Sequence, residues 1–229
     1  MNRPKARASK GAPPAPRDLV DLPYFSALVP ADSAPSRDED YDLVHVDDAS
    51  FADVQADGVR FTESAFSSVR FAEGRFGRSR FVDVWLHTAT LIGTDLAAAS
   101  WLDVEVVTSA FAGTAMYDAA LRRVAFFGCK FVAVNLRAAT LRDVTFTNCT
   151  LRDVDFAGAT LTNVAFPGSS LEEIGFDGAT MTDVDLRAAA ALGIRNGYHS
   201  LKGVTISTAQ LLDLAPAFAA ALGVTVLDG

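Results

Sequence analysis

The sequence has little cysteine, little histidine and no long apolar run. Its 229 residues include only two cysteines, Cys129 and Cys149, too few for a disulfide scaffold. The three histidines, His45, His87 and His199, lie far apart, and their spacing suggests no metal site. No run of about 18 uncharged apolar residues is present, so no membrane-spanning helix is expected.

The sequence also lacks a signal peptide and the common catalytic motifs. Its start, MNRPKARASKGAPPAP, is basic but has no apolar segment of the kind that signal peptides carry. No P-loop, GxGxxG or GxSxG motif occurs. We therefore expect a cytoplasmic protein that is not an enzyme, needs no cofactor and binds no metal.

The charge is unevenly distributed along the chain. The formal net charge is −8, yet residues 1–17 carry five basic residues and no acidic one. The remaining residues carry 15 basic and 28 acidic side chains, a balance of −13. An acidic body disfavours direct binding of nucleic acid or of an anionic membrane by the fold. The Pro- and Ala-rich leader over 1–17 is expected to be disordered.

A period of five residues organises most of the chain. Every fifth position from Phe51 to Leu186 gives 28 positions, of which 13 are Phe and 10 are Leu. The positions two residues earlier are all small or β-branched, with 11 Val and 7 Ala. Neither column contains a charge. Five residues of an α-helix turn through roughly 500°, so the apolar stripe would drift around the cylinder, and this pattern excludes a helix.

A chain that turns a corner every five residues satisfies the pattern. Four sides make a coil of 20 residues, and stacked coils pair as parallel strands at roughly 4.8 Å per coil. Seven glycines, including Gly58 and Gly93, follow the large apolar column by two residues, where a tight turn needs a positive φ. The predicted fold is an all-β solenoid, a right-handed quadrilateral β-helix of about seven coils.

Several segments resemble the pentapeptide-repeat consensus, which reads roughly A-(D/N)-L-x-x. Examples are Val154-Asp155-Phe156-Ala157-Gly158, Val134-Asn135-Leu136 and Val184-Asp185-Leu186. The resemblance covers residues 46–190 and identifies the chain as similar to the pentapeptide-repeat family of actinobacterial type. It implies a non-enzymatic binding protein. In the Qnr-like and mycobacterial fluoroquinolone-resistance members, the rod mimics duplex DNA and occupies the DNA-binding saddle of DNA gyrase. The absence of a long inserted loop makes the mycobacterial kind the nearer comparison.

The ends of the chain depart from the repeat. We expect an N-terminal cap over 18–45, supplied by Leu22, Tyr24, Phe25 and Leu28. The β-helix is expected over 46–206, with a loop at 192–200. Residues 207–229 should form a C-terminal helix, opened by a capping box of Ser207 and Gln210, and a final strand over Val224–Leu227. Pro216 should kink that helix or open a second one. The helix either builds a homodimer, as the resemblance implies, or only covers the last coil; its apolar stripe is Leu211, Leu214, Phe218 and Leu222.

Acidic residues suggest one interaction surface. Residues 141–190 carry eight acidic and three basic side chains, a balance of −5, whereas residues 51–90 carry five of each sign. These acids either serve solubility or imitate DNA towards gyrase or another topoisomerase. The candidates are Asp143, Asp153, Asp155, Glu172, Glu173, Asp177, Asp183 and Asp185.

Apolar residues suggest a second surface. The position after the large column should point outward, and in the middle coils it is often apolar. These residues are either scattered surface hydrophobes or a band that serves an interaction scaffold with an unknown protein partner. The candidates are Trp85, Leu102, Val107, Tyr117 and Phe127. Inside the coils, Cys129 and Cys149 occupy the same position in successive coils and should stack as free thiols.

Overall fold

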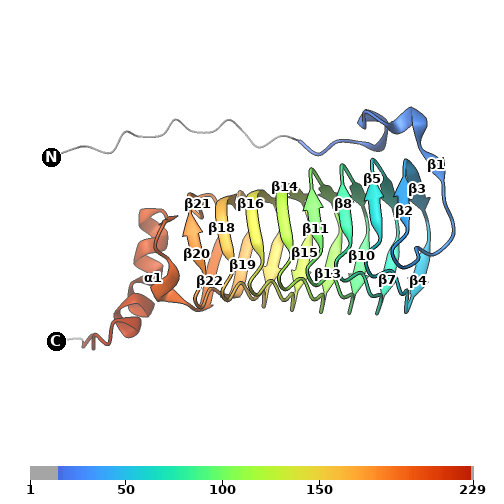
Figure 1. Cartoon of the computed structure of the whole chain (residues 1–229). Helices are drawn as coiled ribbons and strands as arrows, with labels where there is room; N and C mark the ends of the chain where they lie inside the picture. The colour runs from blue at the N-terminus through green and yellow to red at the C-terminus, as the bar shows by residue number, and fades with distance from the viewer. Residues whose placement is uncertain (1–14, 228–229) are drawn as a thin grey trace.

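The computed structural model describes residues 15–227, which form a β-solenoid of about eight turns with one helix at its C-terminal end (Figure 1). Each residue pairs with the equivalent residue of the next coil, as in Phe61 with Phe81 and Trp101 with Leu121. Four parallel ladders therefore run along the rod, one on each face, as the period of five predicts.

Three faces are built from strands. Face 1 contains β2 (Asp40–Asp42), β5 (Arg60–Thr62), β8 (Arg80–Val82), β11 (Ser100–Leu102), β20 (Thr180–Thr182) and the first parts of β14 (Ala120–Phe127), β16 (Thr140–Thr147) and β18 (Thr160–Ala165). Face 2 contains β3 (Val44–Asp47), β6 (Ala65–Ser67), β9 (Trp85–His87), β12 (Glu105–Val107), β21 (Val184–Asp185), β23 (Val204–Thr205) and the ends of β14, β16 and β18, and β1 (Val29–Pro30) pairs with β3. Face 3 contains β4 (Ser50–Ala52), β7 (Arg70–Ala72), β10 (Thr90–Ile92), β13 (Ala110–Ala112), β15 (Lys130–Val132), β17 (Thr150–Arg152), β19 (Ser170–Gly175) and β22 (Ala191–Asn196). Face 4 has isolated bridges from Gln55–Arg75 to Asp155–Gly175, followed by the pair Gly175–Asn196 at the ends of β19 and β22.

The corners between faces have one backbone conformation. Every fifth residue from Asp38 to Asp183 has a positive φ, and 23 of these residues are not glycine. The sequence predicted this conformation only where glycine occurs. Asp and Asn tolerate the left-handed region better than most side chains, which accounts for the many Asp residues at corners.

The interior is filled by the two apolar columns. The large residues stack ring on ring along the axis: Phe146 lies 4.9 Å from Phe126 and 5.0 Å from Phe166 between ring centroids. The Ser109 hydroxyl accepts from the Ala89 N–H and donates to the Val107 carbonyl, both at 2.9 Å. Cys129 and Cys149 are free and buried, as expected.

The N-terminal boundary differs from the prediction. β2 pairs with β5 in full register, so the repeat begins inside the segment 18–45 that we expected to be a cap. This earlier start gives about eight turns in place of about seven. Two short 3-10 helices, η1 (Leu19–Asp21) and η2 (Phe25–Ala27), precede β1. Leu22 and Tyr24 pack against β6 and β9 on the side of the rod, and Phe25 remains exposed.

The C-terminal boundary also differs. Residues 192–200 are not a loop, because β22 continues face 3 through Asn196 with a register shift, and only η3 (Tyr198–Ser200) leaves it. A single helix, α1 (Thr208–Ala221), includes Pro216. Its capping box is confirmed, with the Gln210 N–H donating to Ser207 Oγ at 3.2 Å. The predicted final strand over 224–227 is wrong, since no strand forms there. None of the helices in the described residues is long and apolar enough to cross a membrane.

Candidate functional site

Two columns of acidic residues run along opposite edges of the rod. The edge between faces 1 and 2 and the edge between faces 3 and 4 each carry one corner residue from every coil. We call them the first and second acidic columns. The first consists of Glu63, Asp83, Asp103, Arg123, Asp143, Asn163 and Asp183, and the second of Asp53, Glu73, Gly93, Gly113, Ala133, Asp153 and Glu173.

The two columns differ in continuity. In the first, the Arg123 guanidinium pairs with Asp103 of the preceding coil and holds the pKa of that carboxyl below its usual range. Burial and the neighbouring Asp103 carboxylate raise the pKa of Asp83. In the second column the two middle glycines and Ala133 leave a gap, so its acids lie at the two ends.

All eight candidate acids lie at the surface of the last coils, but arginines partly neutralise them. Arg137 pairs with Asp155 at 3.3 Å and Arg142 with Asp143 at 3.7 Å. Arg187 pairs with Asp185 at 2.7 Å and holds the pKa of that carboxyl below its usual range. Arg195 pairs with Asp153. Exposed pairs of this kind contribute little stability, yet they lower the negative potential around each acid.

The predicted apolar band is largely wrong, because three of its five residues are buried. Trp85 is 3% exposed, Phe127 is 7% exposed and Val107 is 8% exposed. Tyr117 is exposed at 42%, and Leu102 is partly exposed. These two residues lie on faces 4 and 1, so no continuous band remains.

Trp85 is buried because the N-terminal segment lies over it. The Trp85 indole N–H donates to the Arg17 carbonyl at 3.2 Å, and Arg17 forms an ion pair with Glu105 at 2.8 Å. Arg17 is therefore held in place, in contrast to the disorder expected for residues 1–17; residues 1–14 of that leader lie outside the described residues. Sequence reasoning missed Glu105. It could have been found, because it is the one acid between Ala65 and Ala165 in an outer column of face 2 that otherwise holds Ala, Trp and Thr.

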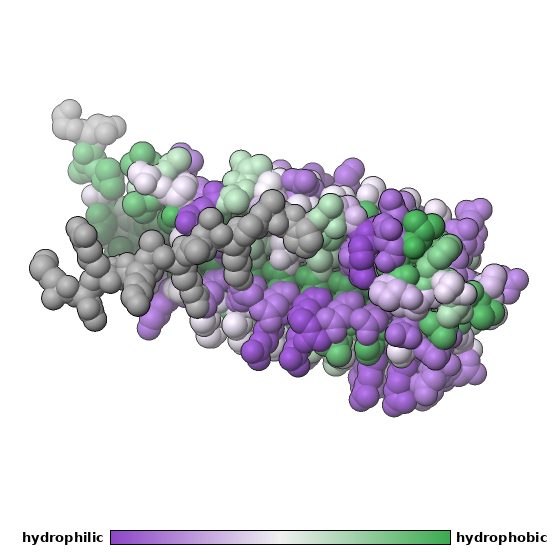
Figure 2. All heavy atoms as spheres, turned by 90° about the horizontal axis from the view of Figure 1, so that it is seen from above, coloured by the Kyte–Doolittle hydropathy of each residue, from purple (hydrophilic) through white to green (hydrophobic). Residues whose placement is uncertain are grey.

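The C-terminal end combines a cap with an exposed apolar surface. Leu214 is buried against the last coil, and the Phe218 ring packs on Tyr198 with centroids 5.9 Å apart. Leu211 and Leu222, from the same predicted stripe, are exposed. Figure 2 shows hydrophobic residues gathered at this end of the molecule.

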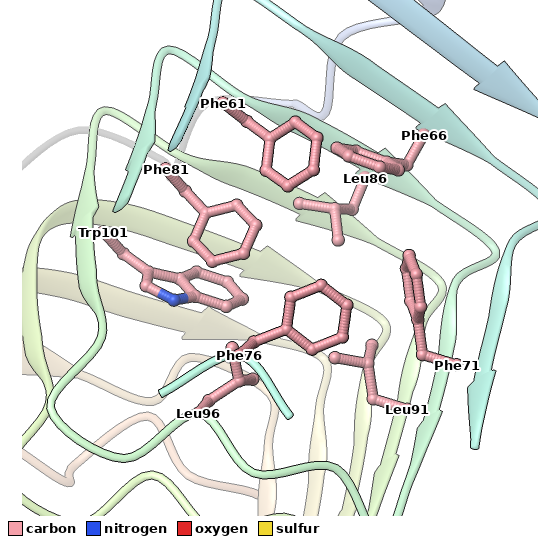
Figure 3. Close-up of a pocket in the computed structure, with 9 residues that line it drawn as sticks. All are labelled: Phe61, Phe66, Phe71, Phe76, Phe81, Leu86, Leu91, Leu96 and Trp101. Carbon is pink, nitrogen blue, oxygen red and sulfur yellow. The ribbon is translucent and has the colours of Figure 1, made fainter. Parts of the chain in front are cut away.

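The interior contains a small apolar cavity of about 20 Å³ between the early coils (Figure 3). Its lining consists only of the side chains of Phe61, Phe66, Phe71, Phe76, Phe81, Leu86, Leu91, Leu96 and Trp101. This volume could hold about one water molecule, but the lining presents only apolar surface to bind it. Among residues 15–227, no group of three or more His, Cys, Asp or Glu side chains could hold a metal ion.

Comparisons with known proteins agree with this geometry. A family model described as a pentapeptide repeat region matches residues 99–176. The chain is similar in structure to a trypsin-treated variant of QnrB1, a plasmid-mediated fluoroquinolone resistance protein, with a TM-score of 0.58 and 16% identity over 87% of this chain and 96% of that chain. It is also similar to HetL, a pentapeptide repeat protein involved in heterocyst differentiation regulation from the cyanobacterium Nostoc sp. strain PCC 7120, with a TM-score of 0.43 and 16% identity over 74% of this chain and 90% of that chain. A comparison with curated proteins found no match.

Proposed function

We propose that this chain, which has the pentapeptide-repeat fold, is a non-enzymatic, cytoplasmic protein of that family that mimics duplex DNA towards DNA gyrase or another topoisomerase. One observation carries the proposal: carboxylates project from opposite edges of a rod, at the corners of its last coils. Duplex DNA likewise presents negative charge along two edges of a rod.

The spacing of these acids supports the proposal. Asp143 and Asp183 lie two coils apart on one edge, about 9.6 Å at the parallel-strand spacing. Asp153 and Glu173 lie one coil apart on the opposite edge. A basic, DNA-binding surface would attract such a rod at long range, and salt would weaken the attraction. The four arginine pairs make the field weaker than that of DNA, so we expect moderate affinity.

The test is DNA supercoiling by purified gyrase, with and without a fluoroquinolone, as the protein is titrated in. We expect inhibition or protection from the drug. The variant Asp143→Asn, Asp153→Asn, Glu173→Gln, Asp183→Asn should need about tenfold more protein for the same effect, because four carboxylates are lost.

A matched control removes the same charge from the other end of the same two columns. Asp53→Asn, Glu63→Gln, Glu73→Gln, Asp83→Asn should leave the effect close to wild type. No effect of the wild-type protein at concentrations on the order of tens of micromolar would refute the proposal. Equal losses in the two variants would show that net charge matters and that the last coils are not the docking surface.

We further propose a homodimer through the C-terminal segment, because Leu211 and Leu222 remain exposed on α1 and just after it. Sedimentation velocity should give a dimer for the wild type and a monomer for Leu211→Ser, Leu222→Ser. The control Val20→Ser removes an equally exposed apolar side chain near the N-terminus and should remain dimeric. A monomeric wild type would restrict α1 to its capping role. The alternative scaffold function is not retained, because most of its apolar band is buried.

A further inference from the structure

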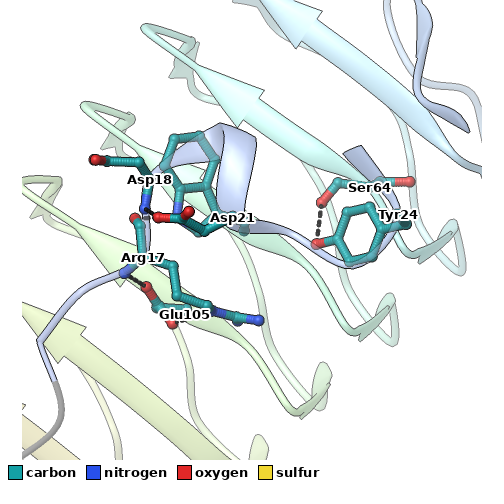
Figure 4. A network of polar contacts seen from close by, with 7 residues as sticks. Arg17, Asp18, Asp21, Tyr24, Ser64 and Glu105 are labelled. Carbon is teal, nitrogen blue, oxygen red and sulfur yellow. Dashed lines mark hydrogen bonds and ion pairs between the residues drawn. The ribbon is translucent and has the colours of Figure 1, made fainter. Parts of the chain in front are cut away.

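The described N-terminal segment lies across three coils of face 2, held by polar contacts (Figure 4). The Arg17 backbone N–H donates to Glu105 Oε1 at 2.6 Å, and its guanidinium Nε donates to Oε2 at 2.8 Å. The Trp85 indole N–H donates to the Arg17 carbonyl at 3.2 Å. Further along, the Tyr24 hydroxyl donates to the Ser64 carbonyl at 3.5 Å. The segment thus contacts β12, β9 and the turn before β6 in succession.

The receiving surface is specific for a peptide. Glu105 uses both carboxylate oxygens on one residue, one for a backbone N–H and one for a side chain. Trp85 binds the carbonyl of that same residue, and its ring stacks on His87 with centroids 5.3 Å apart. Leu22 and Tyr24 pack with Trp85 and Ala65 in a cluster separate from the main core. A charged pair and an apolar pocket therefore contact different parts of one segment.

The segment is not needed to complete the coils beneath it. β6, β9 and β12 are paired with each other and with the neighbouring coils in face 2. Residues 17–28 form no ladder with them, and their regular structure is limited to η1 and η2. The segment joins the sheet only at β1, through Val29 and Pro30. Before β1 it is attached by side chains and by the backbone N–H and carbonyl of Arg17, as a bound peptide would be.

From this geometry we infer that face 2 between β6 and β12 is a peptide-binding site, and that residues 17–24 are its tethered occupant. The partner it fits is a peptide that forms one turn of 3-10 helix after an arginine, with leucine and an aromatic residue five and seven positions beyond that arginine. The chain's own segment fills the site and blocks it until a partner peptide displaces it. This surface lies on the early coils, between residues 65 and 107, whereas the acids of the gyrase proposal lie beyond residue 140, so the inference does not depend on that proposal.

Because residues 17–24 are part of the same chain as the site, a free peptide should bind the intact protein weakly. A short tether holds the segment at an effective concentration on the order of millimolar, against which any free peptide must compete. Weakening the contacts between the internal segment and face 2 should lower that competition without altering the surface to which the peptide binds. Arg17→Ala does this, because it removes the guanidinium contact with Glu105 and leaves only the backbone contacts of that residue, while Arg17 itself lies outside the coils.

The test uses a fluorescently labelled peptide of residues 15–28 and the full chain. Fluorescence anisotropy should show at least about tenfold tighter binding to Arg17→Ala than to wild type. Adding Glu105→Gln to Arg17→Ala should abolish that gain, and so should a peptide with alanine in place of its arginine. Binding that is equal for wild type and Arg17→Ala, or unaffected by Glu105→Gln, would overturn the inference.

Hydrogen exchange on the wild-type chain keeps the inference testable should Arg17→Ala fail to fold. The backbone amides of Leu22, Phe25 and Leu28 are hydrogen-bonded within the segment. They should exchange at least about a hundredfold faster than the amides of β9 and β12, because the segment opens while the coils stay closed. Exchange of both groups at the same slow rate would make the segment part of the fold and overturn the inference.

Discussion

The early and late coils fill one narrow interior in different ways. In the early coils Phe61, Phe66, Phe71 and Phe76 occupy all four sides of one turn, whereas the next turn has Phe81 and three leucines. Phenylalanine then stacks on leucine along three sides, and the 20 Å³ cavity lies there. In the late coils Leu and Phe alternate, and the ring of Phe146 lies nearly parallel to those of Phe126 and Phe166, at 9° and 4°. Placing like on like in successive coils lets the rings stack face to face along the axis.

The outer surfaces divide in the same way. The early coils are neutral between residues 51 and 90, and their face 2 lies under the N-terminal segment. The late coils carry a balance of −5 and end in a helix with exposed leucines. An irregular, covered half and a regular, charged half therefore share one backbone repeat. Packing and surface charge can be varied independently because only the two inward columns determine the coil.

The packing difference predicts unequal costs for the same truncation. Phe146→Ala should lower the free energy of unfolding by about 4 kcal/mol, because stacked rings on both sides cannot collapse into the space. Phe76→Ala should cost about 3 kcal/mol, because Phe76 already borders a cavity and loses fewer contacts. Urea unfolding followed by circular dichroism measures both values. A larger cost at Phe76 would contradict the view that the late coils are better packed.

The covered half should respond to alkaline pH through Tyr24. Burial raises the pKa of Tyr24 to about 12, although the nearby Arg17 acts in the opposite direction. Below pH 10 the hydroxyl is protonated whether or not the segment is docked, so its full contribution is present. Between pH 10 and about 12 the undocked phenol ionises first, and docking loses about 1–2 kcal/mol.

Difference absorbance of the phenolate, wild type minus Tyr24→Phe, isolates this group from Tyr41 and Tyr198. The difference curve should have its midpoint near pH 12. A midpoint near pH 10 would mean that Tyr24 is exposed to solvent and that the segment is not docked as described.

The sequence was sufficient to predict the coils, because their period is set by local rules. Two apolar columns and corner residues such as Gly58 repeat with every side, so each repeat supports the same conclusion. The direction of side chains followed as well: Trp85 does point out of the coil. Its burial could not be predicted, because that depends on a segment 68 residues earlier in the chain.

The errors near the C-terminus have a different physical origin. Leu171 pairs with Leu192, one position beyond the regular coil period, while Ile174 pairs with Ile194, in phase with that period. One extra residue interrupts the five-residue period but does not interrupt the ladder of paired strands. The five-residue pattern therefore predicts a loop where a bulged strand forms. Val224 and Val226 have high strand propensity, but strands need a partner, and no ladder reaches them.

The smallest expected effect concerns the corners, where the two halves again differ. Five of the seven corner glycines lie beyond residue 108, while early corners hold side chains such as Thr88, at φ 55°. A β-branched residue is strained in this region, by about 1–2 kcal/mol relative to glycine, and the freedom of glycine in the unfolded chain offsets part of that. Thr88→Gly should therefore stabilise the protein by about 0.5–1 kcal/mol.

The reverse change in the late coils should cost more than this gain. At Gly158 a Cβ would meet no heavy atom closer than the Ala138 nitrogen at 3.9 Å, so the Cβ of Gly158→Thr meets no steric obstacle and the cost of the change reports mainly backbone strain. We expect a loss of about 1–2 kcal/mol in the same urea assay. If Thr88→Gly stabilises the protein and Gly158→Thr destabilises it, glycine relieves strain at the late corners, and the early half tolerates strain at its corners. If neither change has an effect, the stacked coils absorb the strain, and the distribution of corner glycines has no energetic basis.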